Sequence, residues 1–322
     1  MLARRHLLAA TAVLAAPAVA RAQGWPERPI RLVVPFAAGG GTDVLARILA
    51  NGLSEKLGRQ VLVENRTGAG GNLAMENVIR APADGYSLLM GTNGAIAVNR
   101  HLYRGMGFDP LRDLMPITLA FRIEHLLVVS DAVPARSVAE LVALAKAQPG
   151  VLTFGSGGAG SMIHLAGELF KFRTGIDIVH VPYRGGGPAM NDLVAGNISM
   201  MFDSLPSAEP QVKGGRIRAL ALCGTQRHAL MPDLPTMTEA GVPNYAAAST
   251  GGLFAPLGTP APVVARLGAA VRELVENEAF RTQLGRSGGD AVATSPEELG
   301  SLMAQESAVW EVVVREANIS TN

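Results

Sequence analysis

The sequence predicts an α/β protein of two lobes, in which each lobe is a mostly parallel sheet with flanking helices. Short apolar runs alternate with helical patterns along the chain, as expected for parallel strands joined by covering helices. The chain has 322 residues, of which 48% are hydrophobic and 17% are charged, so it is long enough for two packed domains. The number of candidate strands exceeds what one open sheet usually holds. Two sheets, and therefore two lobes, are the simplest arrangement.

Each candidate strand is a short apolar run, and several candidate helices begin with recognisable capping residues. The expected strands are 30–34, 61–63, 86–90, 126–129, 152–154, 178–181, 198–202, 217–222 and 252–255. The expected helices include 42–57, 138–147, 161–172 and 188–195. Capping boxes of the Ser/Thr-x-x-Glu type predict helix starts at Ser137, Thr236 and Ser295. The sequence shows no long internal repeat and no low-complexity linker, so we expect short crossings between the lobes.

Residues 1–22 have the pattern of a cleavable export signal. The segment MLARRHLLAATAVLAAPAVARA combines a basic head, a short apolar run and an Ala-Arg-Ala ending, with cleavage expected after Ala22. Its ARRHLLA stretch resembles a twin-arginine signal. The alternative is an N-terminal membrane anchor, but the apolar run is shorter than the roughly 20 residues that span a bilayer. The mature chain is therefore expected to be soluble and to lie outside the cytoplasmic membrane, in the periplasm.

The charge and the cysteine content narrow the classes of partner. The net charge is +1, which gives no electrostatic basis for binding nucleic acid or an anionic membrane surface. The single cysteine, Cys223, lies in the apolar run IRALALCGT and is expected to be a buried core residue. No intrachain disulfide can form, and a core of this size does not need one.

Four glycine-rich loops follow predicted strands. They read AAGGGTD (37–43), NRTGAGGN (65–72), GSGGAGS (155–161) and YRGGGPA (183–189), and the first three open a helix. Glycine lets the backbone turn its N–H groups toward a ligand, and the first turn of a helix adds a partial positive charge. Such loops at the carboxyl ends of strands can bind an anion without a charged side chain. Tight turns alone would also require glycine, but four such loops together favour an anion site.

Two enzyme motifs occur in an unsuitable context. The segment 155–160 matches the dinucleotide-binding pattern G-x-G-x-x-G, but the acidic residue expected to close the next strand, Asp177, stands at its start. The segment 285–289 matches G-x-S-x-G but follows a helix, so we expect it to be a glycine helix stop. No phosphate-binding G-x-x-x-x-G-K-[ST] sequence is present.

No metal or cofactor site is expected, because the histidines of the mature chain lack metal-ligand spacing and no cysteine cluster accompanies them. Two polar residues keep functional interpretations open. His164 follows the third glycine loop and could contact either a ligand or the backbone. Asp203 ends a predicted buried strand, where a carboxylate is costly unless it is paired. It could meet a ligand's hydroxyl or cationic group, cap the next turn or pair with an arginine.

Seven ordered segments carry a family resemblance. They are WPERPIRLVVPFAAGGGTDVLAR, VENRTGAGGNLA, ADGYSLLMGT, GSGGAGSMIHLAGELFK, VPYRGGGPAMNDLVAG, MFDS and GLFAPLGTP. Together they resemble the substrate-binding proteins of tripartite tricarboxylate transporters, also called the Bug family, over about residues 25–318. The resemblance implies a periplasmic, monomeric two-lobed binding protein of the Venus flytrap, type II-like kind. Such a protein captures a small organic anion between its lobes and delivers it to membrane transporter components.

The resemblance also implies the lobe boundaries and the ligand-binding residues. Lobe 1 would comprise 25–124 plus 247–322, and lobe 2 would comprise 125–246. The lobe 1 half of the site would be Phe36, Gly40, Gly41 and Thr42, with Thr92 and Asn93 behind them. The lobe 2 half would be Ser156, Gly157, Ser161, Tyr183, Arg184, Gly185, Gly186 and Asp203. Glycine N–H groups and hydroxyls would hold the carboxylate oxygens, and Asp203 would meet the ammonium group of an amino-acid ligand. Arg184 either contacts the ligand or braces its loop.

One stretch departs from the family pattern. Many relatives carry an aromatic residue just before GLFAP, where this chain reads AAASTGG. Ser249 and Thr250 therefore leave more room, or a more polar wall, beside the ligand. The ligand class stays open between a di- or tricarboxylate and an aromatic, longer or amino acid.

These observations favour a binding protein without turnover over two alternatives. The first alternative is a flytrap that presents its closed form to a signalling receptor, which the sequence does not separate from transport. The second is an exported enzyme that acts on an organic acid, with Asp203 and His164 as acid and base. The sequence shows no nucleophile–base pair at recognisable spacing, which disfavours the enzyme.

Overall fold

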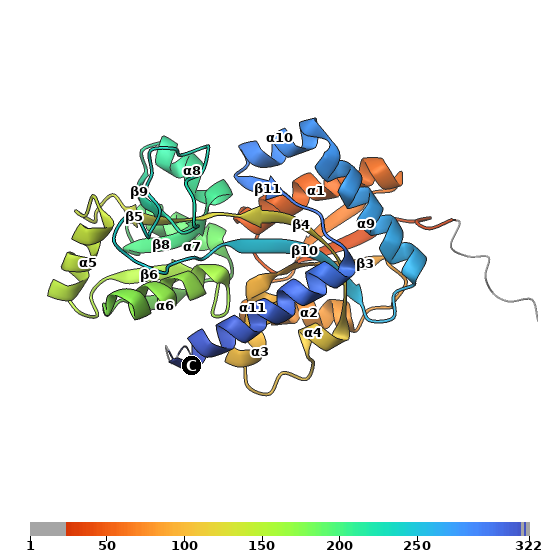
Figure 1. Cartoon of the computed structure of the whole chain (residues 1–322), viewed down its shortest axis with the longest axis horizontal. Helices are drawn as coiled ribbons and strands as arrows, with labels where there is room; N and C mark the ends of the chain where they lie inside the picture. Colours follow the sequence, from red (N-terminus) through yellow and green to blue (C-terminus); the bar gives the residue numbers. More distant parts are fainter. Residues whose placement is uncertain (1–23, 317–318, 320–322) are drawn as a thin grey trace, which may run out of the picture.

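The protein consists of two lobes that lie side by side, each with its own sheet (Figure 1). The computed structural model describes residues 24–316 and Ile319. The predicted export signal, residues 1–22, lies outside the described residues. Among the described residues, no helix has the length and hydropathy that a membrane span requires.

The first lobe is built on a six-stranded sheet of order β11-β4-β10-β3-β1-β2. Its strands are β1 (Ile30–Val34), β2 (Val61–Asn65), β3 (Ser87–Thr92), β4 (Leu114–Ile123), β10 (Ser249–Pro256) and β11 (Gly289–Ala291). The second lobe is built on a five-stranded sheet of order β7-β6-β8-β5-β9. Its strands are β5 (His125–Ser130), β6 (Thr153–Ser156), β7 (Val179–Pro182), β8 (Met200–Ser204) and β9 (Ile217–Leu222).

Helices cover both sheets (Figure 1). Those of the first lobe are α1 (Gly41–Leu57), α2 (Asn72–Ile79), α3 (Asn99–Leu102), α4 (Pro110–Asp113), α9 (Ala261–Glu276), α10 (Glu278–Arg286) and the start of α11 (Pro296–Glu316). Those of the second lobe are α5 (Val138–Ala147), α6 (Met162–Thr174), α7 (Gly186–Ala195) and α8 (Leu205–Lys213). Two short irregular turns, η1 (Ala69–Gly71) and η2 (Gly94–Val98), complete the first lobe.

Both sheets are more mixed than the expected mostly parallel arrangement. In the first sheet, β1 runs parallel to β2 and β3, whereas β10 is antiparallel to β3 and β4, and β11 is antiparallel to β4. In the second sheet, β6 is parallel to β7 and β8, whereas β5 is antiparallel to β8 and β9. The chain leaves the first lobe through β4 and re-enters it through β10, so these two strands must run in opposite directions.

Most predicted elements are present, and two strands were not predicted. The sequence of β4 mixes Pro116, Thr118 and Arg122 with apolar residues, which hides its strand character. Strand β11 has only three residues. The fourth glycine-rich loop also opens a helix, α7, so all four loops lead into helical turns.

Two of the three predicted capping boxes, those at Ser295 and Thr236, form reciprocal hydrogen bonds. The Glu298 backbone N–H donates to Ser295 Oγ at 3.1 Å, and the Ser295 N–H donates to Glu298 Oε2 at 2.7 Å. Thr236 and Glu239 pair in the same way, at 2.8 and 3.2 Å. The Glu140 N–H donates to Ser137 Oγ at the start of α5. The contacts at Ser137 and Ser295 fix the starts of α5 and α11, whereas Thr236 begins a turn and not the predicted helix.

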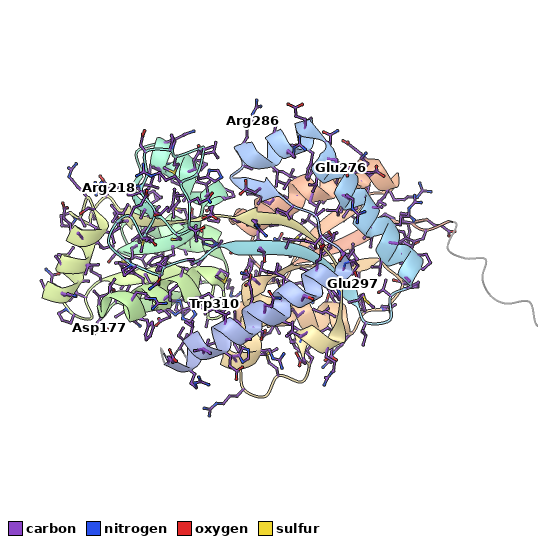
Figure 2. All side chains as sticks on the ribbon, viewed as in Figure 1. Asp177, Arg218, Glu276, Arg286, Glu297 and Trp310 are labelled. Carbon is purple, nitrogen blue, oxygen red and sulfur yellow. The ribbon has the colours of Figure 1, made fainter. Side chains whose placement is uncertain are left out.

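Helix α11 packs against both lobes. Near its start, Leu299 and Met303 belong to an apolar cluster on the first sheet. Near its end, Trp310 and Val314 belong to a large apolar cluster that joins residues of the second lobe with Ala97, Val98 and Leu102 of the first. Figure 2 shows Trp310 where α11 approaches the second lobe, and Glu297 at the opposite end of the helix. The helix therefore ties the lobes together along one side of the junction.

Candidate functional site

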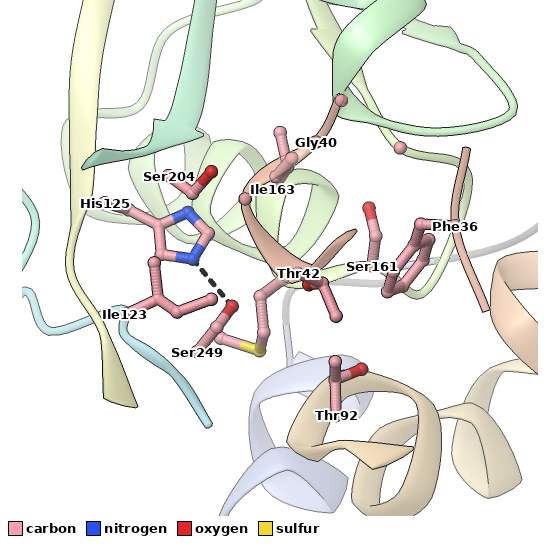
Figure 3. Close-up of a pocket in the computed structure, with 14 residues that line it drawn as sticks. Phe36, Gly40, Thr42, Thr92, Ile123, His125, Ser161, Ile163, Ser204 and Ser249 are labelled. Carbon is pink, nitrogen blue, oxygen red and sulfur yellow. Dashed lines mark hydrogen bonds between the residues drawn. The ribbon is translucent and has the colours of Figure 1, made fainter. Parts of the chain in front are cut away.

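A cavity lies between the lobes, and residues of both lobes line it (Figure 3). The space between the lobes measures about 440 Å³, including the open space at its mouth. From the first sheet and its loops come Phe36, Gly40, Gly41, Thr42, Thr92, Ile123 and Ser249. From the second come His125, Gly157, Ser161, Met162, Ile163, Gly186 and Ser204. Among these described residues there is no lysine, arginine or carboxylate.

Four helices begin at the wall of this cavity. Their N-cap residues are Gly40 for α1, Ser161 for α6, Gly185 for α7 and Ser204 for α8. Among the described residues, no side chain caps α1, α7 or α8, whereas the Ser161 hydroxyl caps α6. Helix N-termini carry unpaired N–H groups and a partial positive charge. Their convergence makes the cavity electropositive without a cationic side chain, which suits an anionic ligand.

The glycine loops 37–43 and 183–189 face each other across the junction, backbone against backbone. The Ala37 N–H donates a hydrogen bond to Arg184 O at 3.2 Å. Gly185 has a φ of +156°, and a Cβ added to it would lie 2.7 Å from Ala37 N. A Cβ on Gly41 would collide with the Ser204 side chain. These loops therefore need glycine for the close approach of the lobes as well as for a turn.

The loops 65–72 and 155–161 form a second contact across the junction. The Tyr103 hydroxyl of the first lobe donates to Ala159 O at 2.6 Å. A Cβ on Gly70 would collide with the same carbonyl, and a Cβ on Gly160 would collide with Asn99 Oδ1. The four glycine loops thus form two matched pairs, and the cavity lies beside them.

Two histidines, the buried His164 and the half-buried His180, hold the 155–161 loop from behind. His180 Nε2 lies 2.6 Å from Ser156 Oγ, which in turn accepts from the Gly158 N–H at 3.1 Å. The Gly160 N–H donates to His164 Nδ1 at 3.2 Å, and the two rings lie 4.2 Å apart. Burial, followed by the neighbouring charges, lowers the pKa of His164 to about 3 and that of His180 to about 4. Both rings are therefore neutral at pH 7, which lets His164 Nδ1 accept a hydrogen bond from the Gly160 backbone N–H.

His125 and Ser249 close one end of the cavity (Figure 3). His125 Nδ1 lies 2.9 Å from Phe202 O, and His125 Nε2 lies 2.6 Å from Ser249 Oγ. Burial lowers the pKa of His125 to about 4, so this ring is also neutral at pH 7. His125 begins β5 and Ser249 begins β10, so the pair joins the two crossings between the lobes.

Asp203 lies next to the cavity but does not line it. Its side chain is fully buried, and a Cβ on Gly186 would lie 3.1 Å from Asp203 Oδ1. Oδ1 accepts a long hydrogen bond of 3.5 Å from Ser204 Oγ, and Oδ2 has no partner among the described residues. Burial raises the pKa of Asp203 to about 6, against the opposing hydrogen bonds from Ser207 and Ser204.

The structure brings eight of the fourteen sequence-predicted site residues to the cavity wall: Phe36, Gly40, Gly41, Thr42, Thr92, Gly157, Ser161 and Gly186. The other six are Asn93, Ser156, Tyr183, Arg184, Gly185 and Asp203, and internal contacts account for most of them. The Asn93 amide donates to Ala248 O and to Glu306 Oε2, and the Tyr183 hydroxyl donates to Asp192 Oδ2 at 2.6 Å.

Six lining residues were not predicted as site residues: Ile123, His125, Met162, Ile163, Ser204 and Ser249. Met162 and Ile163 form the first turn after the Ser161 cap, a position that the helix-start pattern could have indicated. Ser249 was noted only as a departure from the family pattern. Nothing in the local sequence marks His125, because its place depends on a crossing between the lobes.

Comparison with known proteins identifies the family. Over residues 45–319 the sequence matches the family described as the tripartite tricarboxylate transporter family receptor. The chain belongs to this family. The protein BugT of Bordetella pertussis is 35% identical over 317 residues, which are 98% of this chain and 97% of BugT. The resemblance to Bug proteins that the sequence indicated is therefore confirmed.

Solved structures of similar proteins confirm the two-lobed α/β fold. The structure of Rpa4515 from R. palustris with adipate has a TM-score of 0.90 and 40% sequence identity, and covers 92% of this chain and 99% of that one. The structure of MatC from Rhodopseudomonas palustris with bound malate has a TM-score of 0.86 and 33% identity, and covers 90% and 100% of the two chains. The receptor family thus shares this architecture along nearly the whole described chain.

Proposed function

We propose that this receptor captures a small organic carboxylate between its lobes and delivers it to a tripartite membrane transporter. The observation that carries the proposal is the convergence of four helix N-termini on one cavity that lacks a cationic side chain among its described residues. Anions bind at such N-termini through backbone N–H groups. The adipate and the malate in the structures of Rpa4515 and MatC support a carboxylate ligand here.

Binding is proposed to act through closure of the lobes. In an open state, each lobe would present only half of the N–H groups and hydroxyls. A ligand that contacts both halves stabilises the closed state by its difference in affinity for the two states. The glycine loops permit the close approach that closure requires, and the closed form would be recognised by the membrane components.

The boundaries of the lobes and the location of the protein are part of the proposal. We assign 25–124 and 247–322 to lobe 1 and 125–246 to lobe 2, since β4 and β5 meet at Glu124 and β10 returns to the first sheet at Ser249. The end of α11 would cover lobe 2 from the outside. The protein would be periplasmic and monomeric, with residues 1–22 removed during export.

Binding without turnover is proposed over catalysis. Asp203 and His164, the pair that an enzyme would use, both lie outside the cavity wall. His164 is 2% exposed and already accepts a hydrogen bond from its own loop. Neither group is placed to exchange a proton with a ligand in the cavity.

Isothermal titration of the mature protein against mono-, di- and tricarboxylates tests the proposal. We expect at least one acid to bind with a Kd in the micromolar range or below. The same acid should be recovered without chemical change after prolonged incubation with the protein. Gly41→Val, which would drive a side chain into Ser204, should abolish this binding while retaining the far-ultraviolet spectrum of the folded protein. Binding of no acid tighter than millimolar, or conversion of the acid to a product, would overturn the proposal.

A further inference from the structure

We propose that the two lobes part along one edge only, and that an apolar seam on the other side of the cavity acts as the pivot. The opening edge is the contact between the glycine loops 37–43 and 183–189, so the ligand enters and leaves between these loops. The apolar seam is formed by the segment 94–103 and the last turns of α11, packed against α6 of the second lobe. Figure 3 shows Gly40 of the first loop and Thr92, two residues before that segment, on opposite sides of the cavity. This inference rests on the proposed function and specifies how the same site opens.

Among the described residues, only one of the four apolar clusters joins the two lobes, and the other three each stay within one lobe. The joining cluster holds buried side chains from all three parts of the seam, each at most 8% exposed: Ala97, Val98 and Leu102 of the segment 94–103, Trp310 and Val314 of α11, and Leu165 and Leu169 of α6. Pulling these side chains apart would expose apolar surface to water. The seam therefore resists separation.

Backbone contacts reinforce the seam where it reaches the cavity. The Tyr103 hydroxyl donates to Ala159 O at 2.6 Å. A Cβ added to Gly94 would lie 2.8 Å from Gly160 O and 3.1 Å from the backbone nitrogen of Met162, the first residue of α6. Because no space for a side chain is left at this point, the segment and the start of α6 move as one body.

Asn93 ties the seam to one of the two chain crossings between the lobes. Its amide nitrogen donates to Ala248 O at 3.1 Å and to Glu306 Oε2 of α11 at 2.8 Å. Its amide oxygen accepts from the Thr250 N–H at 3.2 Å. When two lobes rotate about a hinge, the chain crossings are the places that move least. The seam therefore lies beside the axis of rotation.

The opening edge lacks an apolar contact of this kind. None of the apolar clusters of the described residues joins its two loops. The Ala37 N–H donates a hydrogen bond to Arg184 O at 3.2 Å, and the facing residues Gly40 and Gly187 have no side chains to bury. Water can replace this hydrogen bond when the loops part, so separation costs less here than at the seam.

Distances between spin labels test the inference on the mature protein. Cys223→Ala, at a fully buried position, provides a background without the native thiol. Labels at Asn51→Cys of α1 and Asn191→Cys of α7 form the opening-edge pair, because these helices begin at the two loops. Labels at Gln305→Cys of α11 and Arg173→Cys of α6 form the seam pair. All four labelled positions are exposed.

The two pairs should respond differently to a ligand. Without ligand, the opening-edge pair should populate distances longer than the described structure allows, whereas the seam pair should keep the distance of that structure. Succinate and citrate are the probe acids. At saturation, an acid that binds should shorten the mean distance of the opening-edge pair by more than about 2 Å and leave the seam pair unchanged.

One variant assigns the pivot to the apolar seam. Trp310→Ala removes the largest side chain that α11 adds to the cluster, so the seam pair should then populate longer distances. Val309→Ala is the matched control on the same helix, where the side chain is 63% exposed, and it should leave the seam pair unchanged. Should Trp310→Ala not fold, Tyr103→Phe takes its place, because it removes only the hydrogen bond to Ala159 O.

The outcomes separate this inference from the proposed function. A seam pair that lengthens in the ligand-free protein overturns the inference while leaving carboxylate binding intact. Two pairs whose distances are the same with and without a bound acid would also overturn it, because the lobes would not open. An unchanged seam pair in Trp310→Ala would assign the pivot to the crossings alone. If no carboxylate binds, the proposed function fails, and the ligand-free distances still decide whether the lobes part along this edge.

Discussion

At the scale of single residues, Gly185 shows how closely the two lobes approach each other. Its Cα faces the backbone of Ala37, and a Cβ would lie 2.7 Å from the Ala37 nitrogen. Real Cβ atoms do not approach a backbone nitrogen this closely, so one loop would have to move. Because the same loops carry the N-termini of α1 and α7, a movement here would also separate the N–H groups that face the ligand.

Gly185→Ala is therefore expected to weaken carboxylate binding by about tenfold or more, because overpacking of the closed state costs about 1–3 kcal/mol. The matched control is Gly39→Ala. Gly39 also has a positive φ, +84°, but nothing lies within 4 Å of an added Cβ. Both variants should share the backbone strain, measured as a loss of melting temperature, but only Gly185→Ala should lose affinity by titration. Equal losses of affinity would show that strain and not collision is responsible.

At the scale of elements, the position of the 155–161 loop depends on two neutral histidines. His180 holds Ser156, and His164 holds Gly160, so both ends of the loop are fixed from within the second lobe. Unfolding releases these rings into water, where the pKa returns to about 6.5. Between pH 4 and 6.5 the unfolded chain then binds more protons than the folded protein, so these groups make stability rise with pH.

The His180→Gln variant isolates one of these contributions. Glutamine does not titrate, so the wild type should lose stability relative to the variant as the pH falls from 7 to 4, by about 2 kcal/mol. The difference should be constant above pH 7. Urea unfolding at a series of pH values measures it. A difference that does not change with pH would mean that His180 has the same pKa in the folded and unfolded states.

Helix α11 contributes a second element-scale prediction, because its last turns reach an apolar cluster that residues of both lobes share. Trp310 is 8% exposed and lies in that cluster. Trp310→Ala should lower the free energy of unfolding by about 3 kcal/mol, the usual cost of truncating a buried aromatic residue. Val309, which is 63% exposed on the same helix, is the control, and Val309→Ala should change it by less than about 0.5 kcal/mol. Chemical denaturation measures the change in unfolding free energy for both variants. Equal changes in the two would contradict a stabilising role of Trp310 in this cluster.

The sequence predicted those elements that carry their own local signal. Strand β1 and helix α5 have the predicted bounds, and the Ser137 and Ser295 side chains cap helix starts as predicted, because apolar periodicity and side-chain caps act within a few residues. Strand β4 was missed because Pro116 and Arg122 interrupt its apolar run. Its conformation is set by pairing with β10, which lies far away in the sequence.

The site was predictable to the extent that glycine loops mark it. The loop residues Gly40 and Gly157 reach the cavity, since glycine-rich helix starts are visible in sequence. Asn93 was also expected there, but its amide is consumed by Ala248 and Glu306. His125 and Ser249 are separated by 124 positions and meet only after both crossings form. No local pattern encodes such a contact.

At the scale of the whole molecule, Glu124 stands where β4 of the first sheet passes into β5 of the second. Its carboxyl lies against Gly224 of the second lobe, and Oε2 has no hydrogen-bond partner among the described residues. Burial, followed by the charge of Asp290 and opposed by Arg122, raises the pKa of Glu124 from 4.5 to about 7. Between pH 4.5 and about pH 7, the Glu124 carboxyl group therefore keeps its proton in the folded protein, whereas it has lost that proton in the unfolded chain.

This raised pKa has the opposite sign from that of the histidines. Between pH 4.5 and 7 the folded protein binds more protons than the unfolded chain, so the contribution of Glu124 is complete below pH 4.5 and is lost as the pH rises through 7. Glutamine mimics the protonated acid at every pH. Glu124→Gln should therefore gain about 2 kcal/mol on the wild type between pH 4.5 and pH 8, measured by urea unfolding. Glu124→Asp, which keeps a carboxyl at the crossing, should show no such gain, and an equal gain in both variants would show that the buried charge is not responsible.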